Sequence, residues 1–304
     1  MRMWRSLLFV PANLKKMVDK VNSLPADGFI FDLEDTVPAD QKQVAREMAR
    51  EAMAGVPGER SWVRCNSLPT GFIHEDIEHF VGAKGFGGFV VPKVDSVEDS
   101  AAMDRMIASV EIRRGLKVGS TPVIAMIESA NGVLDARGIF RIAPRIETAV
   151  YAGGEDGDMN TSLGATWTSA GPEMMFVRQA TLTAMRAANY ECPLDGVYSN
   201  VRDAEGFRSD TELSRRLGFR GRPAIHPNQI EMANEIYTPS KAQVDYYTRV
   251  VNAYKEALTR GTASTTVDGK LVDVAMHNTA QRLLDHMEAI KRLEALIGSH
   301  TRQK

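Results

Sequence analysis

Residues 28–34 read GFIFDLE, an apolar run that ends in acidic residues. A strand with one face in water would alternate between apolar and polar residues, and the interior of this run does not. The run therefore predicts a parallel strand that is buried on both faces. Seven further runs have the same character, at residues 5–11, 61–66, 87–94, 121–129, 148–156, 193–199 and 222–227.

Helical patterns separate these runs. They cover residues 13–22, 40–54, 73–83, 97–113, 172–189 and 210–217, and a last one (228–237) follows Pro227. Ser96 is a typical helix start, because Glu98 and Asp99 follow in the first turn. Eight strand–helix repeats predict an α/β fold, a (β/α)8 TIM barrel.

The chain continues beyond what a barrel needs. A further helix is predicted at 241–260, a polar Gly/Thr-rich stretch at 261–269 and a final amphipathic helix at 275–297. We therefore expect a catalytic barrel at residues 1–238 and a C-terminal helical extension at 239–304. The extension is predicted to be a lid or an arm for oligomerisation.

The composition narrows the class of protein. Of 304 residues, 43% are hydrophobic and 25% are charged, which is typical of a soluble globular domain. A net charge of -2 gives no sign of a nucleic-acid-binding surface. Two cysteines, Cys65 and Cys192, are predicted to be buried thiols, and no run reaches the roughly 20 apolar residues of a membrane span. We expect a cytoplasmic protein without membrane or nucleic-acid partners.

Polar side chains recur where the predicted strands end. They are Asp32, Glu34, Asp35, Arg64, Asn66, Lys93, Glu128, Glu155, Asp156, Asp158 and His226. The active site of a TIM barrel forms at the carboxyl ends of its strands, so these residues would face one mouth. Each one alone could equally be a surface charge or part of a buried ion pair.

Two features of this set indicate a chemistry. Carboxylates on neighbouring strands, at Glu128 and Asp156, suit Mg²⁺, which takes one or two protein carboxylates and completes its shell with water and substrate oxygens. The chain lacks the cluster of histidines and cysteines that zinc prefers. Arg64 offers a planar fork that matches a substrate carboxylate.

Several sequence blocks, in order and spacing, carry a resemblance to a known family. The blocks are RSLLFVPANLKKMVDK, FIFDLEDTVPADQK, VRCN, VVPKVDS, AMIESANGV, GGEDGDMNTSLG, DAEGF and AIHPNQIEMANEIYTP. The chain resembles the HpcH/HpaI aldolase–citrate lyase superfamily over about residues 5–284. The resemblance is to its branch that acts on CoA esters: citrate lyase β subunit, malyl-CoA lyase and citramalyl-CoA lyase.

The resemblance implies roles for residues at the mouth. Glu128 and Asp156 match the two Mg²⁺ ligands of the family, and Glu128 also belongs to the substrate site. Arg64 matches the catalytic arginine that binds the oxoacid part of the substrate. Glu34 and Asp35 match residues that orient it.

Further roles concern the CoA group and the tail. Phe9, Lys20, Ile225 and His226 match positions that line the CoA groove in the malyl-CoA lyase branch. VDGKLVDVAMHNTA resembles the C-terminal block of longer members, where an aspartate, here Asp273, is a catalytic acid/base offered to a neighbouring subunit. The resemblance thus implies a homotrimer or homohexamer.

Some positions depart from the pattern and leave alternatives open. Asp156 is followed by Gly-Asp rather than by an apolar residue, so Asp158 is a rival metal ligand. Leu14 stands where malyl-CoA lyases often have an arginine, which weakens one contact to CoA phosphate. His226 could instead be a histidine that closes the eighth strand.

The expected activity is a Mg²⁺-dependent cleavage of a C–C bond in a short 3-hydroxyacyl-CoA thioester. Malyl-, citramalyl- or citryl-CoA would give an acyl-CoA, such as acetyl-CoA, and a 2-oxoacid. Three alternatives remain at this point: a malyl-CoA thioesterase, a CoA-independent 2-oxoacid aldolase, and a non-catalytic β-type subunit of a larger complex.

Overall fold

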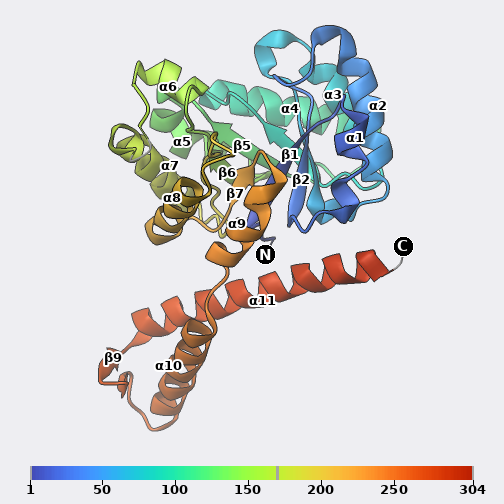
Figure 1. The fold of residues 1–304 in the computed structure, drawn as a ribbon. Helices are drawn as coiled ribbons and strands as arrows, with labels where there is room; N and C mark the ends of the chain where they lie inside the picture. The colour runs from blue at the N-terminus through green and yellow to red at the C-terminus, as the bar shows by residue number, and fades with distance from the viewer. Residues whose placement is uncertain (1, 169–170, 303–304) are drawn as a thin grey trace. The chain divides into compact units, whose positions relative to one another are not determined.

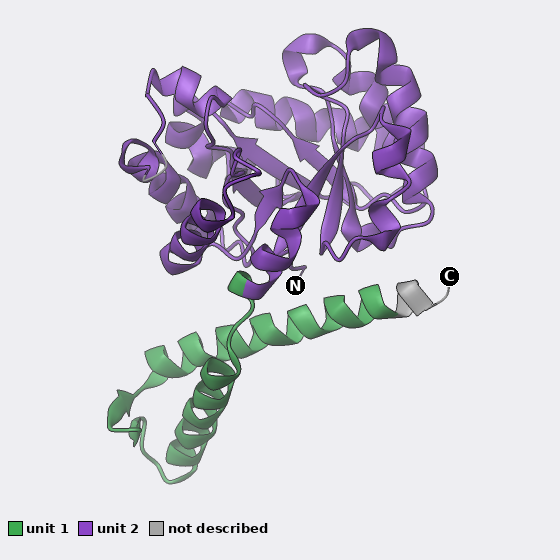
Figure 2. Ribbon diagram, viewed as in Figure 1, with its two compact units in different colours: residues 1, 236–304 green, residues 2–235 purple. Residues whose placement is uncertain are grey.

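The computed structural model of the chain describes residues 2–168 and 171–302. They form two compact units, one of residues 2–235 and one that begins at residue 236 (Figure 2). The smaller unit has a hydrophobic core of its own.

The described part of the larger unit holds a parallel sheet of seven strands (Figure 1). They are β1 (Ser6–Pro11), β2 (Gly28–Asp32), β3 (Ser61–Arg64), β4 (Gly88–Val91), β5 (Val123–Ile127), β6 (Ile146–Tyr151) and β7 (Arg222–Ala224). Their order is β6-β5-β4-β3-β2-β1-β7, and each neighbouring pair is parallel. Strands β2, β4 and β5 are buried along their whole length, which confirms the predicted α/β class with a doubly buried parallel sheet.

The strand predicted at 193–199 is wrong as a regular strand. Leu194 makes one isolated parallel bridge to Val150 of β6 and another to Gly221, just before β7. Beyond this point the Gly196 N–H donates to the Asp195 carboxylate, and the Gly196 C=O accepts from the Arg222 guanidinium. Because side chains satisfy these backbone groups, the segment does not extend the ladder. The sheet is therefore seven-stranded, not eight-stranded.

Helices surround this sheet in Figure 1. They are α1 (Lys15–Val18), α2 (Lys42–Met53), α3 (Ile73–Phe80), α4 (Val97–Arg113), α5 (Ala130–Ile142), α6 (Asp158–Leu163), α7 (Met175–Ala187), α8 (Ala204–Leu217) and α9 (Ile230–Tyr237). The predicted cap at Ser96 is confirmed, because its hydroxyl accepts from the Asp99 N–H at 3.0 Å. Helices α5 and α6 were not predicted, and α8 begins at Ala204, where Asp203 caps it, rather than at residue 210.

The smaller unit consists of two helices joined by a hairpin. Helix α10 (Lys241–Thr259) is followed by β8 (Thr265–Val267), β9 (Lys270–Val272) and α11 (Val274–Arg302). The hairpin turn is Asp268-Gly269, with φ of 52° and 74°, as an Asp-Gly type I′ turn requires. The core of the smaller unit includes Val250, Tyr254, Val272 and Ala280.

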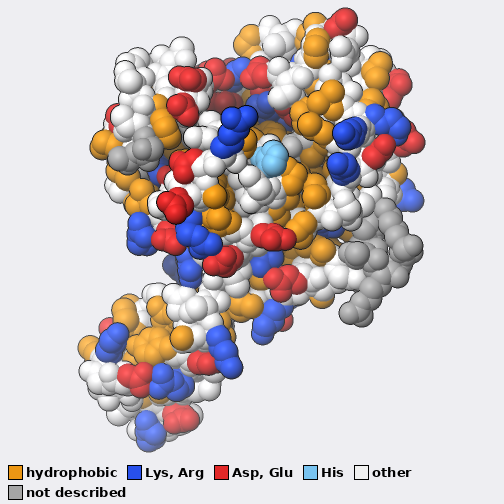
Figure 3. All heavy atoms as spheres, viewed as in Figure 1, with side chains coloured by type: hydrophobic (Ala, Val, Ile, Leu, Met, Phe, Trp, Pro, Cys, Tyr) orange, Lys and Arg blue, Asp and Glu red, His pale blue; other side chains and the backbone are white. Residues whose placement is uncertain are grey.

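Two properties of the surface bear on partners. No helix among the described residues combines the length and apolar character needed to cross a bilayer. On the face in Figure 3, acidic and basic side chains are interspersed, without a broad basic area.

Candidate active site

A cavity of about 310 Å³ opens at the carboxyl ends of the strands. Residues at the ends of β1, β2, β3, β5, β6 and β7 all line it, so it belongs to the sheet as a whole. Its polar lining residues are Asp32, Asp35, Thr36, Arg64, Glu128, Glu155 and Asp158. The predicted mouth is thus a cavity that contains the predicted arginine and several predicted carboxylates.

Arg64, the last residue of β3, is held by Asp32, the last residue of β2. Its Nε and Nη2 donate to the two carboxylate oxygens of Asp32 at 2.6 and 2.7 Å. The guanidinium also lies over the Phe9 ring, 4.9 Å from its centroid. Burial alone would raise the pKa of Asp32, but Arg64 and the Thr36 hydroxyl lower it below its usual value. Both Asp32 and Arg64 are therefore charged, and the two hydrogen bonds fix the orientation of the arginine.

Glu34 adds a second carboxylate to this arginine. The Arg64 Nη1 lies 3.0 Å from Glu34 Oε2, and the Lys93 Nζ lies 3.1 Å from Glu34 Oε1. The backbone of this loop is anchored from α2, since the Lys42 ammonium donates to the carbonyls of Leu33 and Glu34. Burial raises the pKa of Glu34, although Arg64 opposes the shift.

Of the five guanidinium N–H groups of Arg64, two donate to Asp32, and the Nη1 nitrogen is also taken up by the ion pair with Glu34. Two N–H groups remain for another partner. This is the donor pair that a carboxylate or a carbonyl oxygen of a substrate would use.

Glu128 follows β5 and is 7% exposed. Its Oε1 accepts from the backbone N–H of Lys93 at 2.8 Å. Burial raises the pKa of Glu128 to about 7; the Lys93 N–H opposes this, and the charges of Glu34 and Asp158 add to it. The carboxylate is thus buried near two like charges, and the Arg64 guanidinium opposes part of their effect on its pKa.

Lys93 contacts most of these carboxylates. Its Nζ lies 3.1 Å from Glu34 and 3.5 Å from both Asp35 and Asp158. Burial lowers the pKa of Lys93, but the carboxylates outweigh it and raise the pKa above its ordinary value. Lys93 is therefore a permanent positive charge at the mouth.

The loop after β6 carries the two rival metal ligands. Asp158, the first residue of α6, lines the cavity together with Glu155 and Gly157. Asp156 is exposed, has a φ of 55° and is not among the lining residues. The geometry therefore brings Asp158, rather than Asp156, to the same cavity as Glu128.

The donor set fits a divalent cation such as Mg²⁺. Five carboxylates, those of Asp32, Glu34, Asp35, Glu128 and Asp158, lie around the two cations Arg64 and Lys93, so the cavity has more acidic than basic side chains. Among the described residues no group of three or more acidic, histidine or cysteine side chains is arranged to enclose a metal. A metal here would thus take one or two protein carboxylates, as Mg²⁺ does, with water or substrate completing its shell.

The residues predicted to line a CoA groove are partly brought together. Phe9 and Ile225 line the cavity. Lys20 is exposed two residues after the end of α1, and His226 is exposed at the start of the turn before α9. The His226 Nδ1 accepts from the Asn228 N–H at 3.3 Å, so this side chain caps the turn.

Asp273 belongs to the smaller unit. Its Oδ1 accepts from the N–H groups of Ala275 and Met276 at 2.9 and 3.1 Å, so it caps α11. Leu271, Val274 and Met276 near it are exposed apolar side chains.

Two important residues had no role assigned to them from the sequence. Asp32 and Lys93 were both recognised as polar strand ends, but their partners lie on other strands. The positive φ of Lys93, 52°, has no signal in the sequence, because lysine is not a residue that favours it.

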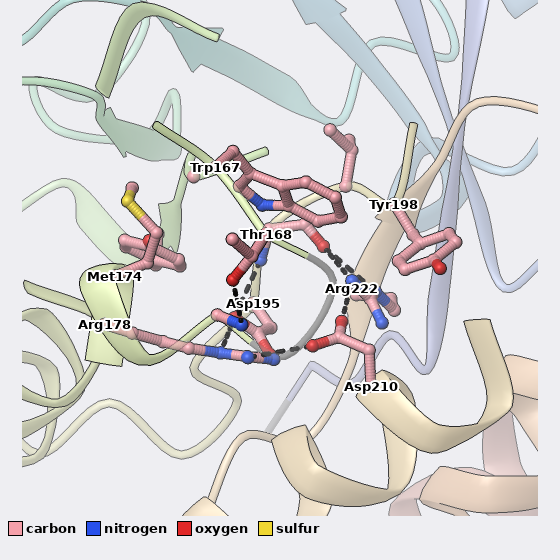
Figure 4. Close-up of a pocket in the computed structure, with 13 residues that line it drawn as sticks. Trp167, Thr168, Met174, Arg178, Asp195, Tyr198, Asp210 and Arg222 are labelled. Atoms are coloured by element: carbon pink, nitrogen blue, oxygen red, sulfur yellow. Dashed lines mark hydrogen bonds and ion pairs between the residues drawn. The ribbon is translucent and has the colours of Figure 1, made fainter. Parts of the chain in front are cut away.

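A second, smaller cavity of about 30 Å³ lies under Trp167 (Figure 4). Arg178 is paired with Asp195, and Asp210 accepts from Arg178 and Arg222 at 2.9 and 2.8 Å. Its two cations and two anions balance, and its volume suits one or two waters. This cavity is a structural ion network, and the large cavity remains the candidate active site.

The chain is similar in sequence to known proteins. A citrate lyase subunit beta from Leuconostoc mesenteroides subsp. cremoris is 35% identical over 93% of this chain and 93% of its own length. A (3S)-malyl-CoA thioesterase from Cereibacter sphaeroides (strain ATCC 17029 / ATH 2.4.9) is 33% identical over 96% of this chain and 97% of its own length.

Among solved structures, CitE from Mycobacterium tuberculosis, in complex with magnesium, acetoacetate and coenzyme A, is similar in fold. Its TM-score is 0.72 at 25% identity, and the match covers 93% of this chain and 97% of CitE. The sequence profile of the HpcH/HpaI aldolase/citrate lyase family matches residues 5–227. The chain belongs to the HpcH/HpaI aldolase/citrate lyase family.

Proposed function

We propose that this chain is a Mg²⁺-dependent lyase that cleaves the C–C bond of a short 3-hydroxyacyl-CoA thioester, releasing an acyl-CoA and a 2-oxoacid. The observation that carries the proposal is the pairing of two elements in one cavity. Arg64, oriented by Asp32, faces the same space as the buried carboxylate of Glu128. A cation beside a carboxylate suited to a metal is the equipment that stabilises a developing enolate or alkoxide.

In this proposal Arg64 binds the oxoacid portion of the substrate. Its two remaining N–H groups donate to the oxygen that becomes the carbonyl of the released oxoacid. Asp32 and Glu34 keep the guanidinium in place, and Asp35 faces the same cavity from the loop after β2. A base takes the proton of the 3-hydroxyl as that oxygen becomes the carbonyl, the electron pair of the broken C–C bond passes to the acyl-CoA, and the enolate that results takes up a proton.

Glu128 and one carboxylate of the loop after β6 would hold the metal. The family resemblance assigns that second role to Asp156, whereas the cavity lining favours Asp158. When bound, Mg²⁺ supplies a Lewis acid for the substrate oxygens.

Asp273 is the proposed acid/base group, contributed by a neighbouring subunit of a homo-oligomer. Its carboxylate caps α11, and exposed apolar side chains flank it, at Leu271, Val274 and Met276. In the proposed homo-oligomer, these exposed apolar side chains would contact the neighbouring subunit. Phe9, Lys20, Ile225 and His226 would contact the CoA group.

We also propose that the sheet works as a closed (β/α)8 barrel at residues 1–238, with 239–304 as an extension. The bridges of Leu194 to Val150 and to Gly221 support this, because they link β6 to the segment before β7. Leu194 would then stand in for the eighth strand.

The test is a panel of malyl-, citramalyl- and citryl-CoA with Mg²⁺, in which the released glyoxylate, pyruvate or oxaloacetate is measured together with free CoA. An oxoacid released in step with acyl-CoA supports the lyase. A malyl-CoA thioesterase is the second candidate, because a protein of that name is 33% identical to this chain. Free CoA without oxoacid would establish the thioesterase and overturn the lyase.

A further inference from the structure

Lys93 has a backbone conformation that its side chain does not favour. It follows Pro92 after β4, with a φ of 52° in the left-handed region. A non-glycine residue there is strained by about 1 kcal/mol or more. The conformation points the Lys93 N–H at Glu128 Oε1, at 2.8 Å.

The side chain of Lys93 has a second role, because its ammonium pairs with carboxylates. Its ammonium lies 3.1 Å from Glu34, on the loop after β2, and 3.5 Å from Asp158, on the loop after β6. It also lies 3.5 Å from Asp35, which lines the cavity. Arg64 is engaged by Asp32 and Glu34, so Lys93 is the cation that balances Asp35 and Asp158.

We propose that Lys93 is a resident counter-cation that sets the affinity of this site for Mg²⁺. Its backbone N–H positions Glu128, while its ammonium occupies Asp158 and repels an incoming divalent cation. This inference rests on the metal site proposed above. It assigns to one residue two opposing effects, and a substitution of the side chain removes the ammonium while keeping the backbone N–H.

Lys93→Met removes the charge and keeps the N–H that positions Glu128. The Mg²⁺ dissociation constant should then fall about tenfold, since a unit charge within a few ångströms of a divalent ion costs at least that much at a partly exposed site. Lys93→Gly also keeps the N–H, and it adopts the positive φ without strain. It should therefore bind Mg²⁺ at least as tightly as Lys93→Met.

Three controls accompany these variants. Lys93→Arg keeps the charge and should stay within about threefold of the wild type. Lys117→Met changes the net charge equally at an exposed position before the amino end of β5, whereas Glu128 follows its carboxyl end, and should have no effect. Glu128→Ala should abolish binding in the wild-type and in the Lys93→Met background, which ties the measured ion to this site.

The experiment is isothermal titration calorimetry of the full metal-free chain with Mg²⁺ alone, with no substrate present. Tighter binding in Lys93→Met and Lys93→Gly supports the inference. Unchanged or weaker binding in these variants overturns it but leaves the lyase untouched. A wild-type chain that binds no Mg²⁺ and keeps lyase activity in EDTA would overturn both the metal site and this role of Lys93.

Discussion

Replacing Arg64 with lysine keeps the positive charge of the site and removes the planar set of N–H donors that the guanidinium provides. Arg64 makes two hydrogen bonds to Asp32 and an ion pair with Glu34, which leaves two N–H groups for the substrate. Lysine cannot hold Asp32 and also present two parallel donors. The loss of one charge-assisted hydrogen bond to the transition state is worth about 1.5–3 kcal/mol, so kcat/KM should fall by about 10- to 150-fold.

The assay couples released glyoxylate to phenylhydrazine with malyl-CoA as substrate, and urea unfolding measures stability in parallel. The matched control is Arg60→Lys, at the amino end of the same strand. Arg60 is also buried, lies over Phe29 and donates to the Ala26 carbonyl, but it is remote from the cavity. If Arg64→Lys turns over within about threefold of the wild type while Arg60→Lys behaves normally, Arg64 does not bind the reacting part of the substrate.

Three further predictions follow from the site and its surroundings. EDTA and Glu128→Ala should each abolish oxoacid release without unfolding the chain, and full activity in EDTA would exclude a metal. Asp156→Ala and Asp158→Ala are compared in the same assay, and the variant with the lower activity identifies the second metal ligand. Co-expressed Asp273→Ala and Glu128→Ala subunits should recover part of the activity that each lacks alone, and verified mixed oligomers without recovery would refute a shared site. Asp210→Asn should cost about 3 kcal/mol near neutral pH, because buried Arg222 loses its carboxylate partner, although Arg178 keeps Asp195. Burial raises the pKa of Asp210, but two arginines lower it below its unfolded value. Its contribution is thus complete above about pH 4 and lost as the pH falls, so urea unfolding of the variant should lack this part of the acid sensitivity.

The sheet was predictable from the sequence because its strands are buried on both faces and therefore read as unbroken apolar runs. Helix α5 was missed because Gly132 and Gly138 lower its helix propensity. The structure gives the reason for Gly138: a Cβ there would lie 2.6 Å from the Val97 side chain, so glycine lets α5 approach α4 closely. At this position the close packing of α5 against α4 outweighs the low helix propensity of glycine.

The site was predictable as a set of strand-end residues but not as a network. Arg64 stands out as a cation at the end of a strand, yet nothing in its neighbourhood says that Asp32, 32 positions earlier, takes two of its donors. Such pairings depend on the register between β2 and β3, which sets Asp32 opposite Arg64. Register is a property of the folded sheet, and a single sequence does not specify it residue by residue.

The two buried thiols give the molecule a pair of built-in reporters. Cys65 directly follows Arg64 at the mouth, and the Cys192 Sγ packs against the backbone of Trp4, which precedes β1. Burial raises the pKa of both thiols, that of Cys192 to about 12, so neither reacts while its surroundings stay closed. The rate at which each is alkylated in the native state therefore measures how often its own end of the larger unit opens. Peptide mass spectrometry after a timed pulse would read the two opening equilibria separately, from the wild-type chain and without an introduced label.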